Sequence, residues 1–283
     1  MDNEPDRASN ELVGALAKIH VHDHLCLIYE TREEQFAAVI PYLRIGLERG
    51  EKCLYVVDDT TADMVINEMR AAGMDVETAM ESGKLAIVSK QDAYLQQGFF
   101  DPDWMIDFLK RSVDEAKAAG FSALRVTGEM TWVLGGDPGS ERLMEYEAKL
   151  NYFLPEHDML AICQYNRSFF PPKIIKDVIS THPLVICGGM VCPNFYYVPP
   201  DDFLGGEQPD REIDRLLANI KNRENMEREL RKRTTELERR NYELEEMNKA
   251  FVGRELRMAE LKERIKELEK ERNGIANIGD KSC

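Results

Sequence analysis

The chain has 283 residues and a mean hydropathy of −0.44, with 43% hydrophobic and 31% charged residues. This composition predicts a folded protein with a sizeable core and excludes a chain that is disordered throughout. A net charge of −15 argues against nucleic acid or an anionic membrane as a partner. No apolar run is long enough to predict a membrane span, and the acidic N-terminus resembles no secretory signal, so we expect a cytoplasmic protein.

The cysteines indicate buried, reduced thiols. The chain contains 6 cysteines, and no two of them form a C-x-x-C pair. All except Cys283 lie in apolar, strand-like runs, which is typical of thiols in a cytosolic core. We therefore expect neither a disulfide framework nor a structural zinc site, and the sequence indicates no cofactor.

Short apolar runs alternate with amphipathic stretches through the first two thirds of the chain. Continuous apolar runs predict buried strands, and an apolar face that recurs at helical spacing predicts the helices between them. The predicted strands span residues 25–29, 52–57, 85–88, 123–127, 160–165, 184–186 and 195–198. The predicted helices span residues 33–49, 61–72, 103–119, 139–153 and 172–179. This order predicts an α/β fold whose mainly parallel sheet carries helices on both faces.

The character of the chain changes near residue 205. Residues 206–283 contain equal numbers of acidic and basic residues, so the whole net charge belongs to residues 1–205. From 211 to 272 the chain has no proline and a single glycine, which predicts one long helix. We therefore predict an N-terminal extension at 1–19, an α/β domain at 20–205, a helix at 206–272 and a flexible tail at 273–283.

A seven-residue repeat runs along the predicted long helix. One position of the repeat is apolar from Leu230 to Ile265, and Arg223 is its only polar member. The position three residues later mixes methionine and leucine with Arg233, Arg240 and Arg254. The repeat predicts a coiled-coil homodimer that is weaker than a leucine zipper. The alternative is a single solvated helix.

Polar and aromatic residues gather where the predicted strands end. Ligands of parallel α/β sheets bind beyond the carboxyl ends of the strands, so these residues are candidates for a small-molecule site. The alternative for the aromatic residues is simple packing against helices. The candidates at the strand ends are Tyr29, Glu30, Asp58, Asp59, Glu129, Trp132 and Tyr165.

Two common site types find little support. The link after the first strand has three glutamates and no glycine, whereas a P-loop needs glycines and a lysine to hold phosphate. His20, His22, His24 and Cys26 would share one side of an extended chain, which is a possible metal spacing. The alternative is a polar entry into the first strand with Cys26 buried, and we therefore assign no metal ligand.

Several ordered strings together resemble the MEDS sensory domain, named for methanogens, methylotrophs and a dichloromethane-responsive regulator. The resemblance covers about residues 20–204. The strings are HLCLIYE at 24–30, TGEMTW at 127–132, ERL at 141–143, EYE at 145–147, CQY at 163–165, THP at 181–183 and NFYYVP at 194–199.

The resemblance implies a cytoplasmic sensory module that binds small hydrocarbon derivatives and is joined to DNA-binding or histidine-kinase output regions. It also implies a degenerate relative of the RecA/KaiC fold, because GEKCLYVVDD at 50–59 is similar to the KaiC strand that ends in two catalytic acids. The missing P-loop departs from that pattern and argues against ATPase activity. The sensing residues that the resemblance implies are His24, Cys26, Tyr29, Glu129, Trp132, Cys163 and Tyr165.

The long helix resembles coiled coils that flank sensor domains in signalling proteins. Its string FVGRELR at 251–257 is similar to a histidine-kinase phosphoacceptor box, with Arg254 in place of the histidine. Residues beyond 205 contain no histidine, so we expect no histidine phosphorylation there.

Three hypotheses follow. The leading one is a non-enzymatic sensor that binds a small molecule and dimerises through the coil. Its output partner would be a histidine kinase or another signalling protein. The second is a RecA-like ATPase that uses Asp58, Asp59 and Glu129. The third is a scaffold for kinases whose α/β domain binds nothing.

Overall fold

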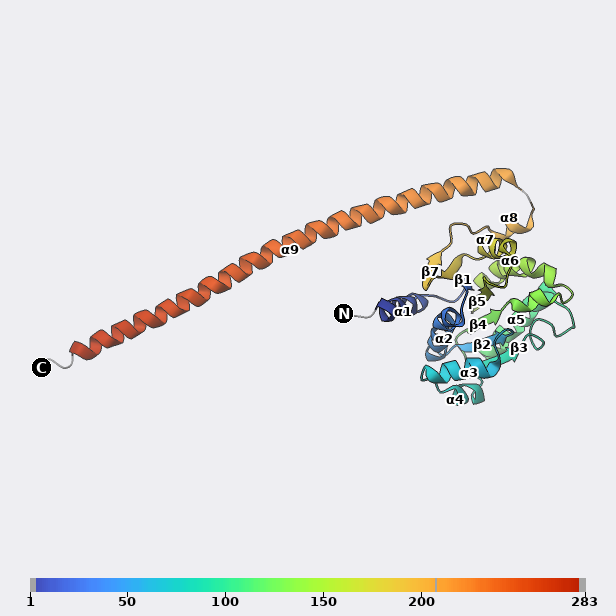
Figure 1. Cartoon of the computed structure of the whole chain (residues 1–283), viewed down its shortest axis with the longest axis horizontal. Coiled ribbons are helices and arrows are strands. Elements are labelled where there is room, and N and C mark those ends of the chain that lie inside the picture. The colour runs from blue at the N-terminus through green and yellow to red at the C-terminus, as the bar shows by residue number, and fades with distance from the viewer. Residues whose placement is uncertain (1–3, 207, 280–283) are drawn as a thin grey trace. The chain divides into compact units, whose positions relative to one another are not determined.

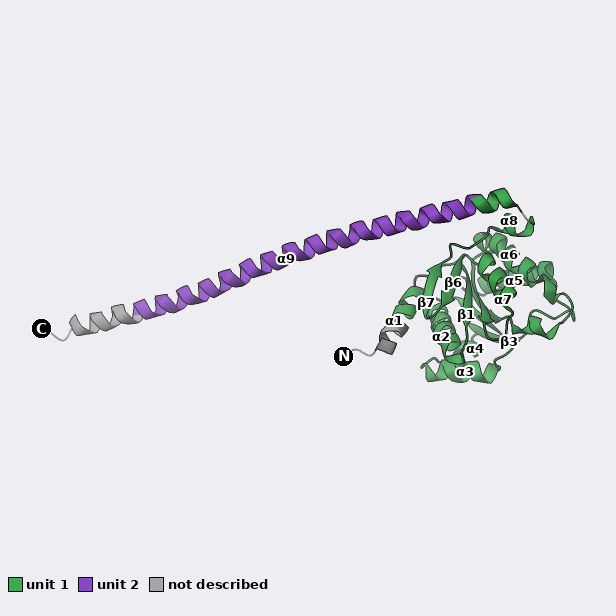
Figure 2. Ribbon diagram, turned by 45° about the horizontal axis from the view of Figure 1, so that its top comes forward, with its two compact units in different colours: residues 1–213 green, residues 214–283 purple. Residues whose placement is uncertain are grey.

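The computed structural model describes the backbone of residues 4–206 and 208–279, and the side chains of 10–206 and 208–269. The chain divides into two compact units, residues 1–213 and 214–283 (Figure 2). Within the described residues, no helix is both long and apolar enough to cross a membrane.

Strands and helices alternate through the first unit (Figure 1). The strands are β1 (His24–Tyr29), β2 (Lys52–Val57), β3 (Leu85–Ser89), β4 (Leu124–Glu129), β5 (Met159–Asn166), β6 (Leu184–Cys187) and β7 (Met190–Pro193). The helices of the chain are α1 (Glu4–Leu16), α2 (Arg32–Glu48), α3 (Ala62–Ala71), α4 (Val76–Glu81), α5 (Pro102–Ala118), α6 (Leu143–Phe153), α7 (Pro172–Thr181), α8 (Pro200–Leu204) and α9 (Pro209–Gly279). Short 3-10 helices span Thr131–Gly135, Ser140–Arg142 and Leu154–Glu156.

The strands form one sheet in the order β3-β2-β4-β5-β1-β6-β7. All neighbouring pairs are parallel except β6 and β7. Cys26 of β1 lies beside Cys163 of β5 in the register. The prediction of a mainly parallel α/β sheet is therefore confirmed.

Each face of the sheet has its own core, as expected for a parallel sheet covered by helices on both sides. Leu25, Leu27 and Tyr29 of β1 point into a core with α1, α2, α3 and α4. Cys26 points to the opposite face, where side chains of α5, α6 and α7 pack. This alternation along β1 places Cys26 and Cys163 on the same face of the sheet.

Local sequence signals explain several helix ends. Thr31 begins α2 by accepting a hydrogen bond from the Glu34 backbone N–H at 3.3 Å. Asp101 begins α5 by accepting one from the Trp104 N–H at 2.9 Å. Side-chain oxygens at these positions satisfy backbone donors that have no partner inside the helix.

The strand predicted at residues 195–198 is wrong. Residues 190–193 form the last strand instead, because Gly188 and Gly189 have φ values of 52° and 73° and turn the chain back onto β6. Beyond this strand, the Asn194 amide donates to the carbonyls of Ile179 and His182, at 2.6 and 2.7 Å. These bonds hold the following residues as an irregular segment against α7.

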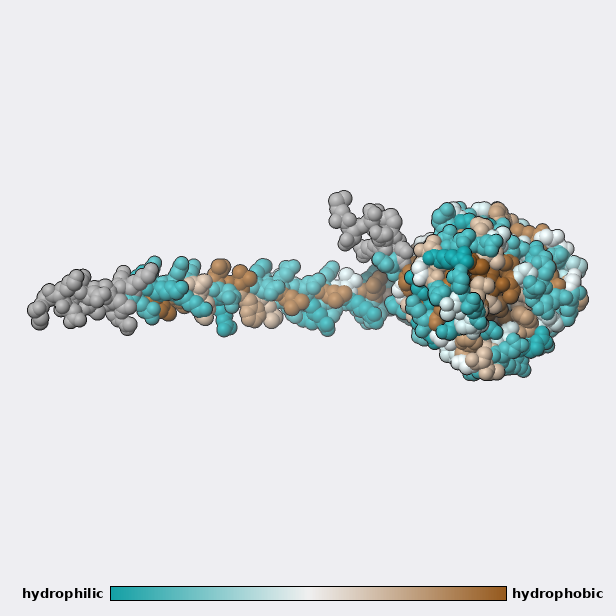
Figure 3. All heavy atoms as spheres, turned by 90° about the horizontal axis from the view of Figure 1, so that it is seen from below, coloured by the Kyte–Doolittle hydropathy of each residue, from teal (hydrophilic) through white to brown (hydrophobic). Residues whose placement is uncertain are grey.

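Residues 214–279 of helix α9 belong to the second unit. The helix runs to Gly279, past the start of the predicted tail at 273, whereas residues 280–283 lie outside the described residues. Ion pairs between residues four apart, such as Arg228 with Glu224 and Arg240 with Glu236, support the helix. Figure 3 shows apolar side chains scattered along α9 among hydrophilic ones.

Candidate functional site

The three acidic side chains predicted at the ends of β1 and β2 are each paired with a cation. Glu30 lies 3.4 Å from Arg167, Asp58 lies 2.9 Å from Lys90, and Asp59 lies 2.7 Å from Arg32. These pairs lie near the surface, where ion pairs contribute little to stability. The charge of each of these carboxylates is therefore balanced by a neighbouring cation.

Glu129 is buried at the end of β4 and accepts hydrogen bonds from several donors. Its Oε2 accepts from the backbone N–H groups of Asp58 and Thr60, at 3.0 and 2.8 Å. Its Oε1 accepts from the Tyr55 hydroxyl at 2.8 Å, from the Gln35 amide at 3.3 Å and from the Thr60 hydroxyl. Through these hydrogen bonds, the Glu129 carboxylate links the end of β4 to the segment that follows β2. This role is structural.

The predicted aromatic residues are packed in the two cores. Trp132 stacks on Tyr94 with ring centroids 4.9 Å apart, and it also packs against Phe100. Tyr29 is buried in the core on the other face of the sheet. Trp132 and Tyr29 therefore lie on opposite faces of the sheet.

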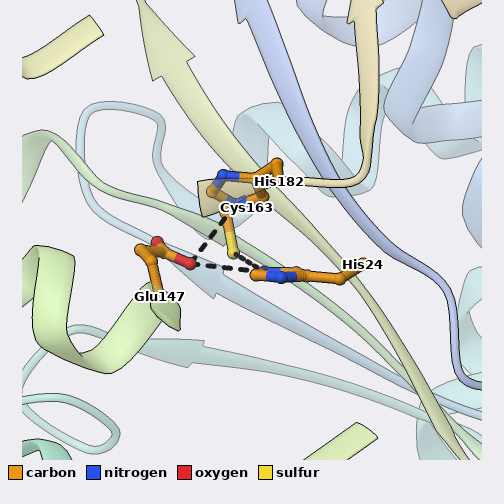
Figure 4. A group of neighbouring side chains, drawn as sticks. All are labelled: His24, Glu147, Cys163 and His182. Carbon is orange, nitrogen blue, oxygen red and sulfur yellow. Dashed lines mark hydrogen bonds and ion pairs between the residues drawn. The ribbon is translucent and has the colours of Figure 1, made fainter. Parts of the chain in front are cut away.

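A buried group of four side chains joins residues that are far apart in the sequence (Figure 4). His24 lies at the start of β1, Glu147 on α6, Cys163 in β5, and His182 in the link between α7 and β6. None of the four is more than 3% exposed. The group lies between the sheet and α6, on the face of β1 that also carries Cys26.

Three contacts define the geometry of this group, which we name the His-Glu-Cys cluster. His24 Nε2 and His182 Nε2 each lie 3.3 Å from Glu147 Oε2. His24 Nε2 also lies 3.7 Å from Cys163 Sγ. All four ligand atoms lie within 4.8 Å of one another.

The outer nitrogens of both histidine rings are held by acceptors. His182 Nδ1 lies 2.7 Å from the Val178 carbonyl, which can only accept a hydrogen bond. His24 Nδ1 lies 3.0 Å from Asn151 Oδ1. The Asn151 amide is oriented by donating to two backbone carbonyls, so its oxygen faces His24. Both Nδ1 atoms therefore carry the proton, and both Nε2 atoms turn toward Glu147.

Burial governs the electrostatics of the cluster. Desolvation would raise the pKa of the Glu147 carboxyl, but His182 and His24 hold that pKa below its usual range. Desolvation, together with His182, lowers the pKa of His24. Burial next to Glu147 raises the pKa of the Cys163 thiol well above its usual value. The cluster thus packs a carboxyl group, a thiol and two imidazole rings against one another in a buried interior.

The structure brings together part of the predicted site. His24, Cys163 and Tyr165 belong to one neighbourhood, because the Tyr165 hydroxyl donates to Glu147 Oε1. Cys26 shares the same core. The histidines at 20, 22 and 24 do not share one side of an extended chain, because His22 has a φ of 83°, and His20 and His22 are exposed whereas His24 is buried.

Sequence reasoning missed Glu147 and His182 as members of the site. Both residues lie in the EYE and THP strings that carry the family resemblance, and those strings were the signal that could have found them. Their approach to His24 depends on how α6 and α7 pack on the sheet, which no local spacing reveals.

A separate apolar pocket of about 550 Å³ lies between the carboxyl end of β1, helix α7 and the β6–β7 hairpin. Its walls include the apolar side chains of Ile28, Phe170, Ile175, Ile179 and Val185. Polar groups at its walls include Arg167 and the thiols of Cys187 and Cys192. The volume and the apolar walls are typical of sites for small organic molecules.

The described cysteines should differ sharply in reactivity. Cys187 is exposed and Cys192 partly exposed, whereas Cys26, Cys53 and Cys163 are buried. In native protein with Cys283 replaced by serine, we expect a thiol reagent to modify the buried three at least about 100-fold more slowly. Peptide mapping by mass spectrometry measures the rates. Equal rates for Cys163 and Cys187 would contradict the described burial.

Residues 23–183 match the family described as the methanogen/methylotroph, DcmR sensory domain, abbreviated MEDS. A curated relative is the transcriptional repressor DcmR of Methylorubrum extorquens, which is 26% identical over 183 residues. This match covers 64% of the present chain and 66% of the repressor, so the chain spans slightly less than two thirds of that relative.

Two solved structures are also similar. A KaiC-like protein from Pyrococcus horikoshii has a TM-score of 0.42 at 20% identity, covering 58% of this chain and 70% of that protein. The flagellar accessory protein FlaH from Methanocaldococcus jannaschii has a TM-score of 0.44 at 14% identity, covering 67% of this chain and 82% of that protein.

The α/β unit is a sensory domain built on a mainly parallel 7-stranded sheet, and the link after β1 has no P-loop sequence. Since the family match covers more than half of the residues, the chain belongs to the MEDS family. The predicted family is thereby confirmed, and a role in signalling or regulation follows from it.

Proposed function

We propose that this chain is a non-enzymatic, cytoplasmic signal-transduction protein whose MEDS domain binds a small hydrocarbon derivative in the apolar pocket. The observation that carries the proposal is the pocket itself, with its volume of about 550 Å³ and its mainly apolar walls. Burying an apolar molecule there contributes about 25 cal/mol for each Å² of apolar surface removed from water. The Arg167 guanidinium supplies a polar group that can orient one end of the molecule.

The position of the pocket suits a sensor. One wall is formed by α7 and the β6–β7 hairpin, and the chain continues from Tyr196, another wall residue, through α8 into α9. A ligand that binds one arrangement of this wall more tightly than another would shift the conformational equilibrium of the segments that follow the wall. The proposed relay is therefore a change in the wall that is passed along the chain to the coil.

The proposed output is a coiled-coil homodimer of α9 that recruits another protein, such as a histidine kinase, rather than nucleic acid. In the described chain, Leu230, Leu237, Leu244 and Phe251 are all exposed on α9 at seven-residue spacing. A second copy of the chain is the partner that matches this stripe, because a heptad seam pairs with an equal seam. Arg233 and Arg240 at the second seam position would weaken the dimer, so that the arrangement of its two helices can change.

An equilibrium titration tests binding. Dichloromethane, methanol, 1-hexanol and hexanoate are added separately to the full chain while its thermal unfolding is followed. A compound that binds the native state at a hundredfold excess over its dissociation constant adds about 2.7 kcal/mol to the free energy of unfolding. The absence of any shift at millimolar concentrations of all four compounds would contradict the proposal.

Filling the pocket should abolish this stabilisation. Ile179→Trp places a large side chain at the pocket wall, and we expect the dissociation constant of the best-binding compound to rise at least about tenfold. Leu134→Trp is the matched control, because Leu134 is an exposed apolar residue outside the pocket lining. Equal affinities of the two variants would place the binding site elsewhere.

A RecA-like ATPase is the alternative function, and the contacts argue against it. Glu129 already accepts five hydrogen bonds from protein groups, and Asp58 and Asp59 are paired with Lys90 and Arg32. We therefore expect no ATP turnover above that of buffer.

A further inference from the structure

Three of the six spacings within the His-Glu-Cys cluster match the edges of a metal coordination tetrahedron. Zinc–nitrogen and zinc–oxygen bonds of about 2.0–2.1 Å place two such ligands about 3.3 Å apart, and a zinc–sulfur bond of about 2.3 Å places nitrogen and sulfur about 3.6 Å apart. The observed distances are 3.3 Å from Glu147 Oε2 to each histidine Nε2 and 3.7 Å from His24 Nε2 to Cys163 Sγ.

Two of these four atoms lack a hydrogen-bond partner. Glu147 Oε2 and His182 Nε2 are fully buried and make no hydrogen bond to any described group. Buried polar atoms without partners are costly, so an arrangement that leaves two of them facing each other needs an explanation. Two histidine nitrogens, His24 Nε2 and His182 Nε2, converge on the same carboxylate oxygen, Glu147 Oε2, and a shared cation would explain this arrangement.

The outer contacts are those of metal-binding histidines. Such rings usually donate their second N–H to a carbonyl or carboxylate, which fixes the ring and its tautomer. Here the Val178 carbonyl and Asn151 Oδ1 serve as the acceptors. Asn151 is itself fixed by the carbonyls of Glu147 and Thr181.

We propose that His24 Nε2, Glu147 Oε2, Cys163 Sγ and His182 Nε2 bind one zinc(II) ion. Imidazole and thiolate ligands favour zinc over calcium or magnesium, which prefer six or more oxygen ligands. Binding releases the Cys163 thiol proton, so the ion, the thiolate and the Glu147 carboxylate together carry no net charge.

The zinc site would be closed and structural. All four ligands come from the protein and are buried, whereas catalytic zinc keeps one position open for water. The ion would join β1, β5 and α6 to the link that leads into β6. This inference goes beyond ligand sensing, and its test is independent of it, because metal binding is measured without any organic compound.

Cobalt(II) is the probe for this site. The full chain is stripped of metal with a chelator, refolding is checked by circular dichroism, and cobalt is then titrated in. We expect one cobalt per chain, visible bands typical of tetrahedral cobalt and a near-ultraviolet thiolate-to-cobalt band, all displaced by one equivalent of zinc. Protein purified without chelator should also retain close to one zinc per chain in elemental analysis.

Three serine variants assign the thiolate. Cys163→Ser should remove the thiolate band and weaken cobalt binding at least about 100-fold. Cys53→Ser and Cys187→Ser should keep both, since Cys53 is a buried cysteine in the other core and Cys187 an exposed one. A wild-type chain without the thiolate band, or an unchanged band in Cys163→Ser, would overturn the proposal. If Cys163→Ser fails to fold, the wild-type spectrum and zinc content decide alone.

Discussion

Replacing Glu129 with glutamine is expected to lower the free energy of unfolding by about 3–5 kcal/mol, because a buried acceptor of several hydrogen bonds is exchanged for a group that also donates. An amide nitrogen in place of Glu129 Oε2 would face the N–H groups of Asp58 and Thr60. In place of Oε1, it would face the Tyr55 hydroxyl and the Gln35 amide. Chemical denaturation of the full chain measures the loss.

Glu30→Gln is the matched control for this change. Glu30 directly follows β1 and Glu129 is the last residue of β4, but the Glu30 side chain is exposed and, among the described residues, pairs only with Arg167, at 3.4 Å. We expect a change within about 0.5 kcal/mol. The parent protein could instead hydrolyse ATP measurably, and a stable Glu129→Gln protein could lose this activity. Glu129 would then have a catalytic role, and the sensor account would be wrong.

Replacing Leu244 with lysine is expected to weaken the proposed homodimer at least about 100-fold. The substitution removes a seam leucine from both chains of the dimer, and each fully buried leucine contributes about 1.5–3 kcal/mol. Since about 1.4 kcal/mol corresponds to a tenfold change in affinity, two leucines give at least two orders of magnitude. Sedimentation velocity over a micromolar concentration range measures the shift.

Leu256→Lys provides the same substitution away from the seam. Leu256 is an equally exposed leucine of α9, but it lies outside the register of Leu230, Leu237 and Leu244. We expect this variant to dimerise like the parent. A parent chain that is monomeric at micromolar concentration would refute the dimer, and a truncation to residues 1–205 that stays dimeric would place the interface in the α/β domain.

The sheet could be predicted from the sequence because its strands are continuous apolar runs. The predicted range 52–57 agrees fully with β2, and the ranges for β1 and β5 differ from the structure only by end residues. Helix α1 was not predicted, although its buried Leu12 and Leu16 pack in the core with α2. Its apolar face is too short to stand out from an acidic N-terminal segment.

The candidate site was harder to predict than the sheet. The strand-end rule selected Asp58, Asp59 and Glu30, whose charges are neutralised by Lys90, Arg32 and Arg167. The His-Glu-Cys cluster instead depends on contacts between residues more than a hundred positions apart in the sequence, such as His24 and Cys163. Such contacts follow from the pairing of β1 with β5 and from the packing of α6 and α7 on the sheet, which a single sequence does not specify.

Hydrogen–deuterium exchange on the full chain, with and without a saturating amount of the best-binding compound, tests the sensor account most directly. The account predicts slower exchange in the β6–β7 hairpin and in α7, which line the pocket, together with a changed exchange rate in α9. Unchanged exchange around the pocket would contradict ligand binding there. A change around the pocket without any change in α9 would contradict the relay to the coil.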